Sequence, residues 1–325
     1  MSFRVLPVPD GLDGQRVDSA LARMLGLSRT KAGELCAQGR VVSEGNVLTK
    51  SDRLLGGSML EVDLPQPRSP EPVARQVDDM GIIYVDDDLV VVDKPAGIAA
   101  HPSMGWDGPD VLGALKACNI SVTTSGAAER QGIVSRLDVG TSGVMVVARS
   151  EYAYSSLKQQ FREHSVDKIY HTLVQGHPDP TSGTIDAPIG RHPSREWKMA
   201  IIEGGRASRT HYDMIEAMPR ASLLEIHLET GRTHQIRVHM AHIAHPLLGD
   251  QTYGGRPRPP KNASEELMEV LRNFKRQALH AVMLRLQHPI SGEMMEWYAP
   301  LPDDFVELVT ALKADYVLHK DELDY

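Results

Sequence analysis

The stretch GIVSRLDVGTSGVMVVARS, residues 132–150, decides the fold of this chain. A glycine-flanked loop with one carboxylate, Asp138, precedes the apolar run Gly143–Ala148, which predicts a buried strand. Functional side chains are often placed on such a loop at the end of a strand. The competing interpretation is an Asx-turn, in which Asp138 only bonds the nearby backbone, and the local pattern by itself favours that interpretation.

On either side of this stretch, helix and strand patterns follow one another without regular βαβ alternation, which indicates an α+β fold. Apolar patterning predicts strands at Lys168–Val174 and Ala281–Leu286 and an amphipathic helix at Glu151–Glu163. We also predict a helix that is capped by Thr233 and runs through His242.

A proline-rich segment divides the chain. Four prolines fall between Pro65 and Gln76, and such a composition is typical of an extended, semi-stiff linker. We therefore predict a small domain at residues 1–64, a linker at 65–78 and a larger domain at 79–325.

Composition limits the class of protein. The chain has 325 residues, is 41% hydrophobic and 24% charged, and carries a net charge of −8, which are values of a globular protein. No apolar run has the length of a transmembrane helix or a signal peptide, so we predict a cytoplasmic protein without a membrane segment. Cys36 and Cys118 do not make a disulfide framework or a zinc site. The negative charge argues mildly against a nucleic-acid ligand, although a local basic face is enough to bind one.

Five segments, in order along the chain, resemble the RluA-type pseudouridine synthases, which modify large-subunit ribosomal RNA and some transfer RNA. Residues 136–143 resemble the family signature, and Lys168-Ile169-Tyr170 resembles its KxY element. The other segments are Asp86–Pro102, Leu228–Gly254 and Leu279–Pro289. The resemblance implies an α+β catalytic domain with a mixed, mainly antiparallel sheet. Positions that depart from many members, none of them the family's nucleophile, are Ser135, Val139 and Gly140.

The resemblance also assigns catalytic roles. Asp138 corresponds to the aspartate that attacks C1′ or C6 of the target uridine, or removes a proton from the 2′ carbon. Arg237 corresponds to its basic partner, which would orient the carboxylate and favour its charge. Tyr170 corresponds to the tyrosine that stacks on the flipped uracil and whose hydroxyl helps to remove the C5 proton. The isomerisation involves no net redox change and no energy input, so we predict no cofactor and no metal.

Several basic residues are predicted to bind RNA. Arg136 corresponds to an arginine that fills the space left by the flipped base, with a structural salt bridge as the alternative. Residues 15–62 resemble the αL RNA-binding module of a small-subunit ribosomal protein, whose basic side chains would contact phosphates. The alternative for these charges is a solvated helix surface. The residues predicted to face RNA are Arg136, Arg16, Arg29, Lys31, Arg40, Arg232 and His234.

The predicted partner is RNA, and the αL module favours large-subunit ribosomal RNA or its precursor, modified by a monomeric enzyme. One alternative is the same chemistry on transfer RNA, whose enzymes more often lack the module. Another is a catalytically inert RNA-binding or ribosome-assembly protein, against which the intact Asp138, Tyr170 and Arg237 argue.

Two further classes of enzyme are weaker alternatives. A glycoside-type hydrolase would pair Asp138 with Asp86–Asp88, but that run is better explained as a hairpin turn. A metalloenzyme could use His239 and His242, which are three positions apart on the predicted helix. No HExxH-type set completes such a site, so we interpret these histidines as packing or RNA-facing residues.

Overall fold

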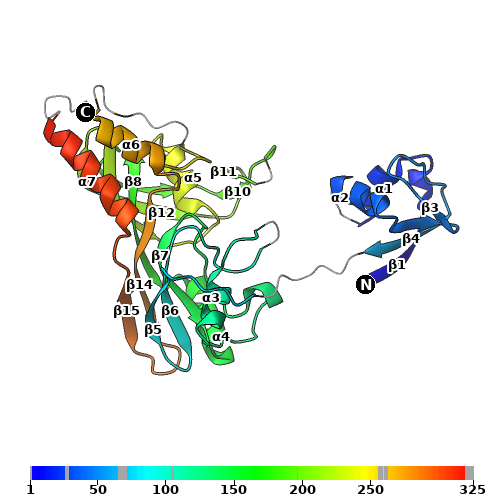
Figure 1. Ribbon diagram of the computed structural model, residues 1–325, viewed down its shortest axis with the longest axis horizontal. Helices are drawn as coiled ribbons and strands as arrows, with labels where there is room; N and C mark the ends of the chain where they lie inside the picture. The colour runs from blue at the N-terminus through cyan, green and yellow to red at the C-terminus, as the bar shows by residue number, and fades with distance from the viewer. Residues whose placement is uncertain are drawn as a thin grey trace. The chain divides into compact units, whose positions relative to one another are not determined.

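The structure is a computed structural model, and it describes residues 2–25, 29–64, 72–103, 106–195, 197–254, 259 and 263–318. The chain divides into two compact units, Met1–Ser69 and Pro70–Tyr325 (Figure 1).

The second half of the predicted linker is part of the larger unit. Residues 65–71 of that linker lie outside the described residues. The carbonyl of Pro72 accepts a hydrogen bond from the Lys116 ammonium at 3.2 Å, and the N–H of Arg75 donates to the carbonyl of Gly113 at 3.1 Å. The chain is therefore fixed to the helix α3 (Val111–Ala117) from Pro72 onward.

The first unit has, among its described residues, a four-stranded antiparallel sheet in the order β1–β4–β2–β3, covered by two α-helices. Leu21, Leu35 and Leu60 are buried in its core. The strand β1 pairs with β4 along its whole length, and its pattern was not recognised in the sequence. The elements are β1 (Ser2–Pro7), a 3₁₀ turn (Asp10–Leu12), α1 (Val17–Leu25), α2 (Arg29–Ala37), β2 (Val41–Ser43), β3 (Asn46–Val47) and β4 (Met59–Leu64).

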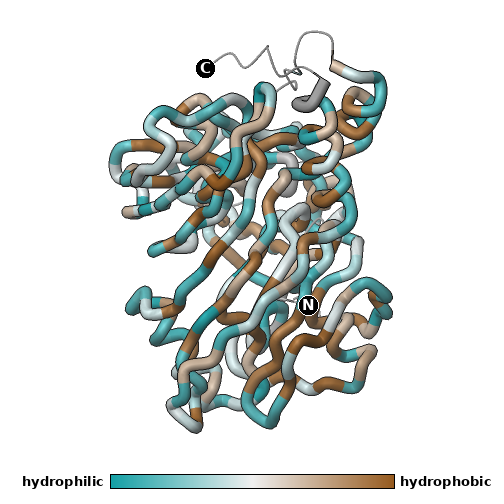
Figure 2. The backbone as a smooth tube through the Cα atoms, turned by 90° about the vertical axis from the view of Figure 1, so that its left-hand side faces the viewer, coloured by the Kyte–Doolittle hydropathy of each residue, from teal (hydrophilic) through white to brown (hydrophobic). Residues whose placement is uncertain are grey.

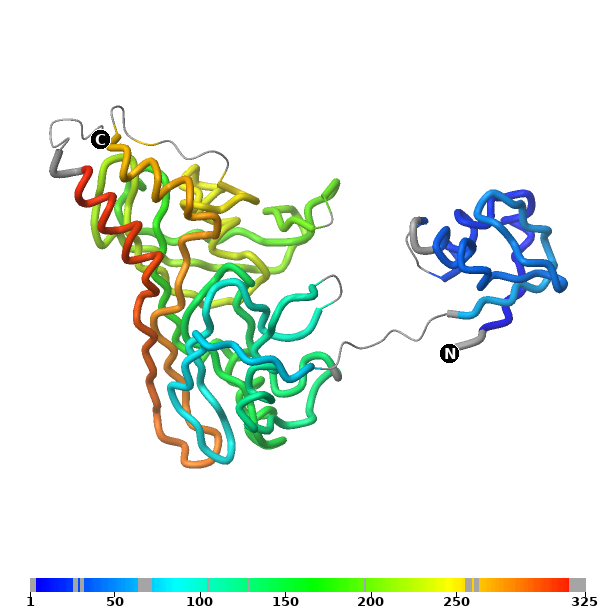
Figure 3. Tube along the Cα trace, viewed as in Figure 1, coloured from blue at the N-terminus to red at the C-terminus, as the bar shows by residue number. Residues whose placement is uncertain are grey.

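The second unit is built on a large sheet whose nine described strands run in the order β5–β6–β7–β14–β8–β13–β12–β9, with β15 paired to β14. The pairing of β7 with β14 is parallel and the other pairings are antiparallel, so the predicted α+β fold with a mixed, mainly antiparallel sheet is confirmed. Figure 3 shows the late strands, in orange, running beside strands from the middle of the chain. The strands are β5 (Gly81–Val85), β6 (Leu89–Lys94), β7 (Ser142–Ala148), β8 (Asp167–Gln175), β9 (Ser182–Asp186), β12 (Arg209–Met218), β13 (Ala221–Leu228), β14 (Leu279–Gln287) and β15 (Met294–Tyr298), with β10 (Ile189–Arg191) and β11 (Met199–Ile201) as a separate pair.

The strand β7 is buried on both faces, which explains its unbroken apolar sequence. Val144 and Val146 pack on one side against Leu157 of the helix α4 (Glu151–Glu163). Val147 packs on the other side against Leu115 of α3. Figure 2 shows hydrophobic residues recurring along the strands of the sheet. The loop that carries Asp138 enters the sheet through this rigid strand.

The other half of the sheet is also covered on two sides. On one side Leu224 of β13 packs against Ile236 of α5 (Gln235–His242). On the other side Leu223 packs with Phe305 of α7 (Asp303–Leu318), which lies next to α6 (Glu265–Asn273). None of the described helices is both long and apolar enough to cross a membrane.

The predicted cap of α5 is wrong. The residue before the helix is His234, in a left-handed conformation with φ 57°, and it makes no side-chain capping bond. The hydroxyl of Thr233 instead accepts a hydrogen bond from Arg136 at 3.2 Å. The carbonyl oxygen of the Gln235 side chain accepts from the N–H of Arg232 at 3.0 Å, which closes the turn. By contrast, the predicted bounds of α4 are confirmed, with Ser150 as its N-cap.

Candidate active site

A buried lysine, Lys94, holds the loop that follows Asp138. The side chain of Lys94 is fully buried at the end of β6, and its ammonium donates to the carbonyls of Pro95, Ile98 and Val139 at 2.9, 3.0 and 3.4 Å. Burial lowers the pKa of Lys94 to about 7, and the negative charge of Asp138 opposes that shift. Three carbonyl oxygens therefore stabilise the Lys94 ammonium, and one of them, that of Val139, belongs to the loop after Asp138.

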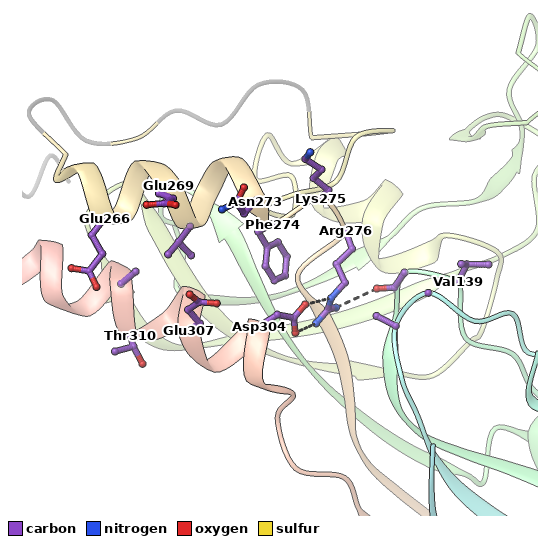
Figure 4. Close-up of a pocket in the computed structure, with 15 residues that line it drawn as sticks. Val139, Glu266, Glu269, Asn273, Phe274, Lys275, Arg276, Asp304, Glu307 and Thr310 are labelled. Carbon is purple, nitrogen blue, oxygen red and sulfur yellow. Dashed lines mark hydrogen bonds and ion pairs between the residues drawn. The ribbon is translucent and has the colours of Figure 1, made fainter. Parts of the chain in front are cut away.

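Two side chains from the segment before β14 hold the next residues of the loop. The guanidinium of Arg276 donates to the carbonyl of Gly140 at 3.2 Å, and the amide of Gln277 donates to the hydroxyl of Thr141 at 3.1 Å. Arg276 also forms an ion pair with Asp304 at the start of α7, at 2.6 Å. Figure 4 shows the Arg276 side chain lying between Asp304 and the loop that contains Val139. The loop after Asp138 is thus held at three consecutive residues, through the carbonyls of Val139 and Gly140 and the side chain of Thr141.

A hollow of about 930 Å³ lies on the α6–α7 side of this loop (Figure 4). Besides the Arg276–Asp304 ion pair, its wall contains one lysine, Lys275, and three carboxylates, those of Glu266, Glu269 and Glu307. The carboxylates outnumber the lysine, and like charges repel, so this wall disfavours RNA phosphates.

Asp138 is held by a buried arginine. The guanidinium of Arg237, on α5, donates to Oδ2 of Asp138 at 3.0 Å. On its other edge, Nε and the second terminal nitrogen donate to Asp250 at 2.7 and 3.0 Å. The Asp250 side chain is fully buried, Arg237 is 9% exposed and Asp138 is 25% exposed. The arrangement is therefore a chain of three charges that becomes more exposed toward Asp138.

The electrostatics of this chain follow from its burial and its bonds. Burial lowers the pKa of Arg237, but the bonds and charges of Asp250 and Asp138 outweigh burial and raise it above its ordinary value. Burial raises the pKa of Asp250, but Arg237 and the backbone N–H groups of Thr252 and Tyr253 outweigh burial and lower it. Arg237 and Asp250 therefore both stay charged, and the two bonds from Arg237 to Asp250 fix the position of the guanidinium.

The opposite oxygen of Asp138 is open. Within the described part of the chain, Oδ1 has no hydrogen-bond partner, and no backbone N–H donates to the carboxylate. The Asx-turn interpretation is therefore wrong for this side chain. Asp138 lines a cavity of about 70 Å³ together with Tyr170, Arg237, Leu228 and Leu279. It is the one carboxylate in that lining.

Tyr170 enters this cavity from β8, where its backbone pairs with Ile226 and Ala281. Burial, together with the negative charge of Asp138, raises the pKa of Tyr170 above its ordinary value. The side chain is therefore a neutral phenol at physiological pH, with its ring beside the carboxylate. This state suits stacking better than proton removal by a phenolate.

The predicted RNA-facing residues of the catalytic unit lie at the rim of the same cavity. Arg136, Arg232 and His234 all line it. Nε2 of His234 is 3.9 Å from Asp138, and its Nδ1 is 2.9 Å from the hydroxyl of Tyr253. Arg136 is exposed and donates to the Thr233 hydroxyl, and it has no carboxylate partner among the described residues, where the salt-bridge alternative therefore finds no support.

The residues proposed for other enzyme classes lie elsewhere. Asp86 accepts hydrogen bonds from the N–H groups of Asp88 and Leu89 in the turn between β5 and β6, and it does not line the Asp138 cavity. His239 is buried, with its ring nitrogens 2.9 and 3.0 Å from the Thr210 hydroxyl and the Ala187 carbonyl. No group of three potential metal ligands occurs among the residues that the structure describes.

In the first unit, the predicted RNA-facing cations are paired with carboxylates. Arg16 and Arg29 lie 2.9 and 3.5 Å from Asp18, and Arg40 lies 3.9 Å from Asp63. These three side chains are 42%, 64% and 34% exposed, so they remain available to solvent. The fourth predicted cation, the side chain of Lys31, lies outside the described residues.

The sequence analysis missed Asp250, the buried end of the charge chain, and Tyr253, whose ring lies 5.1 Å from the guanidinium of Arg237. Asp250 lies in a segment that carried the resemblance, but an aspartate after a glycine indicates only a turn. The N–H of Tyr253 donates to Asp250 within that turn at 3.0 Å. The contacts of both residues with Arg237 depend on the fold and give no signal in the sequence.

The comparisons with known proteins agree with this geometry. Residues 88–242 match the model of the RNA pseudouridylate synthase family. An uncharacterized RNA pseudouridine synthase of Mycobacterium bovis is 54% identical over 97% of this chain and 100% of its own. The ribosomal large subunit pseudouridine synthase D of Haemophilus influenzae is 47% identical over 96% of this chain and 95% of its own. The solved structure of human RNA pseudouridylate synthase domain containing 1 is 27% identical, with a TM-score of 0.55, over 74% of this chain and 97% of its own.

Such a match over nearly the whole chain defines an isomerase class as well as a fold. The chain belongs to the RNA pseudouridylate synthase family. It is an RNA pseudouridine synthase.

Proposed function

We propose that this enzyme converts uridines of large-subunit ribosomal RNA to pseudouridine, with Asp138 as the catalytic carboxylate. The observation that carries the catalytic assignment is the charge chain of Asp250, Arg237 and Asp138, which leaves one oxygen of Asp138 open beside Tyr170. The ribosomal target is supported by relatives named ribosomal large subunit pseudouridine synthase D, which this chain matches along almost their whole length.

The isomerisation exchanges one glycosidic bond for another. The bond from uracil N1 to ribose C1′ breaks, the base rotates, and a bond from C5 to C1′ forms. C5 loses a proton and N1 gains one, so the atoms balance without a co-reactant. Asp138 can begin this sequence by attack on C1′ or C6 or by taking a proton from the 2′ carbon, and each route uses its open oxygen.

The neighbours of Asp138 position it and the base. Arg237 keeps Oδ2 occupied, so the open Oδ1 has one direction of approach. The ring of Tyr170 stacks on the extruded uracil, and Leu228 and Leu279 complete an apolar wall of the cavity. Arg136, exposed at the rim, replaces the base in the RNA stack.

The first unit serves as an RNA-binding module, and the enzyme acts as a monomer in the cytoplasm. Arg16, Arg29 and Arg40 supply phosphate contacts from exposed positions. Charge-reversing all three to Glu should weaken binding to full-length target RNA more than activity on a short stem-loop, and equal activity on both would contradict the module's role.

The test of function is tritium release from RNA labelled at uracil C5, prepared from cells that lack the enzyme. Wild type should release tritium from large-subunit ribosomal RNA without forming free uracil, and Asp138→Asn should release none. Asp213→Asn, an exposed aspartate on β12, is the matched control and should behave as wild type. Tritium release from transfer RNA alone would mean that the substrate is transfer RNA rather than ribosomal RNA. Formation of free uracil would indicate hydrolysis of the glycosidic bond.

A further inference from the structure

A second cavity opens beside the cavity of Asp138. Its volume is about 280 Å³, and the two cavities share a wall that includes Arg136, Leu137, Tyr170 and Leu228. Tyr170 lines both of them, so the second cavity adjoins the space beside Asp138. The proposed chemistry does not use this space.

The side chain of Lys168 lines this cavity. Lys168 is 9% exposed, and among the described residues its ammonium has no hydrogen-bond or ion-pair partner. Its close neighbour is the ring of Phe161, 5.8 Å from Nζ to the ring centre. The adjacent Asp167 is itself bound to Arg285, at 2.6 Å. Burial lowers the pKa of Lys168 to about 8, with the charge of Asp167 acting against the shift. Lys168 is therefore a largely buried cation that lines the cavity without a carboxylate beside it, and such a partly desolvated charge is a reason to expect an anionic ligand there.

The lining of the cavity is cationic. Arg136, Arg162 and Arg232 surround it, and no aspartate or glutamate is among the described residues that line it. The chain as a whole has a net charge of −8, and the hollow beside α6 and α7 carries several carboxylates. The remaining wall is mostly apolar, with Phe161 and Met283 among its side chains.

We propose that this cavity is a phosphate subsite, which takes one phosphodiester group of the RNA next to the nucleotide whose base enters the Asp138 cavity. The proposal rests on the function proposed above. Lys168 and Tyr170 are two positions apart on β8 and so face the same side of the sheet, roughly 6.6 Å apart along the strand. A base stacked on Tyr170 therefore has its flanking backbone within reach of the Lys168 ammonium. Arg162 and Arg232 provide further donors, and the apolar wall accommodates the ribose.

A phosphodiester fits these groups better than a base does. Lysine and arginine offer donors and no acceptor, so a ligand must accept hydrogen bonds wherever it meets Lys168 and the arginines. A nucleobase also carries N–H donors or ring nitrogens that this lining would leave unmatched on the apolar side. A phosphate presents only oxygen acceptors and neutralises the ammonium.

The experiment measures equilibrium binding of an RNA fragment that the wild-type enzyme is known to modify, at several salt concentrations. Lys168→Met should weaken binding roughly 10- to 100-fold, as expected for a charge-assisted bond. The slope of log affinity against log salt should become shallower by about 0.7 to 0.9, the contribution of one phosphate. Lys158→Met, an exposed lysine on α4 outside the cavity lining, should change neither quantity.

RNA with single methylphosphonate linkages identifies the contact. Wild type should lose affinity roughly tenfold at one linkage flanking the target uridine, and Lys168→Met should lose nothing further at that linkage. Ser135→Asp, which places a carboxylate in the cavity wall, should reproduce the shallower slope if Lys168→Met fails to fold. An unchanged salt slope in both variants, or equal wild-type affinity for every flanking methylphosphonate, would overturn the proposal. The RNA fragment is chosen because wild type modifies it, so an error in the proposed target would be seen as absent turnover. An error in the phosphate subsite would be seen only in the binding measurements.

Discussion

Replacing Asp250 with Asn tests whether the buried end of the charge chain controls the exposed end. Asp250 accepts two bonds from Arg237 and two from backbone N–H groups, and its side chain is fully buried. The amide keeps an acceptor for the backbone but loses the charge, so Arg237 is left as a buried cation with one partner. Breaking a buried ion pair costs about 3–5 kcal/mol, and we expect a loss of about 3 kcal/mol in the free energy of unfolding.

The effect on catalysis follows from the same geometry. Without its rear anchor, the guanidinium no longer holds Asp138 in one orientation, and losing one charge-assisted bond of about 1.5–3 kcal/mol corresponds to roughly a 10- to 100-fold lower rate. RNA affinity should stay within about threefold of wild type, because Asp250 is 2% exposed and cannot touch RNA.

The assay is tritium release in a single turnover with saturating enzyme, combined with urea unfolding and RNA binding. Asp213→Asn controls for the loss of one negative charge at an exposed position. A single-turnover rate within threefold of wild type in a folded Asp250→Asn enzyme would refute the idea that Asp250 orients the catalytic pair. A lower affinity at an unchanged rate would refute it equally, because the effect would then lie in binding.

Three further predictions use groups described above. Lys94→Met leaves buried carbonyls without a donor. Because each unsatisfied group costs about 1–3 kcal/mol, the free energy of unfolding measured in urea should fall by about 2–4 kcal/mol. A fall below about 1 kcal/mol would contradict the role of Lys94 in satisfying these carbonyls. Burial lowers the pKa of His280 from 6.5 to about 4. As pH falls, the imidazole is therefore protonated at a higher pH in the unfolded chain than in the folded protein. Stability should therefore decline by about 3 kcal/mol from pH 7.5 to 4, and His280→Gln should remove that component of the pH dependence of unfolding. Tyr170→Ala should weaken RNA binding by about 1–3 kcal/mol, whereas Tyr170→Phe should keep wild-type affinity in the same titration, because the ring does the stacking.

Local patterns predicted the local structure well. The bounds of α4 follow from its amphipathic pattern and the Ser150 cap, and the buried strand β7 follows from an uninterrupted apolar run. The pattern failed where a long-range contact took over a local role. Thr233 has the chemistry of a helix cap, but its hydroxyl is bound by Arg136, so the helix begins after His234 instead.

The site was predictable only in part, because its contacts join distant positions. Asp138 and Arg237 were paired through a family resemblance, since no spacing rule connects residues that far apart. Asp250 and Lys94 give no local signal, because their roles depend on burial and on partners that only the folded sheet brings near. Lys168 was noticed as part of a motif, but its lack of a partner is visible only in three dimensions.

The place of β14 in the sheet has a consequence for how the enzyme is made. β14 joins β7 to β8, although it is synthesised long after both. At about 5–20 residues per second, the ribosome exposes β7 on the order of ten seconds before its partner exists. During that interval the growing chain carries two partial sheets with open, apolar edges, and Arg276 and Gln277 have not yet emerged to hold the catalytic loop. A nascent chain interrupted before β14 should therefore be a substrate for chaperones, and the enzyme gains its activity only after β14 has joined the sheet.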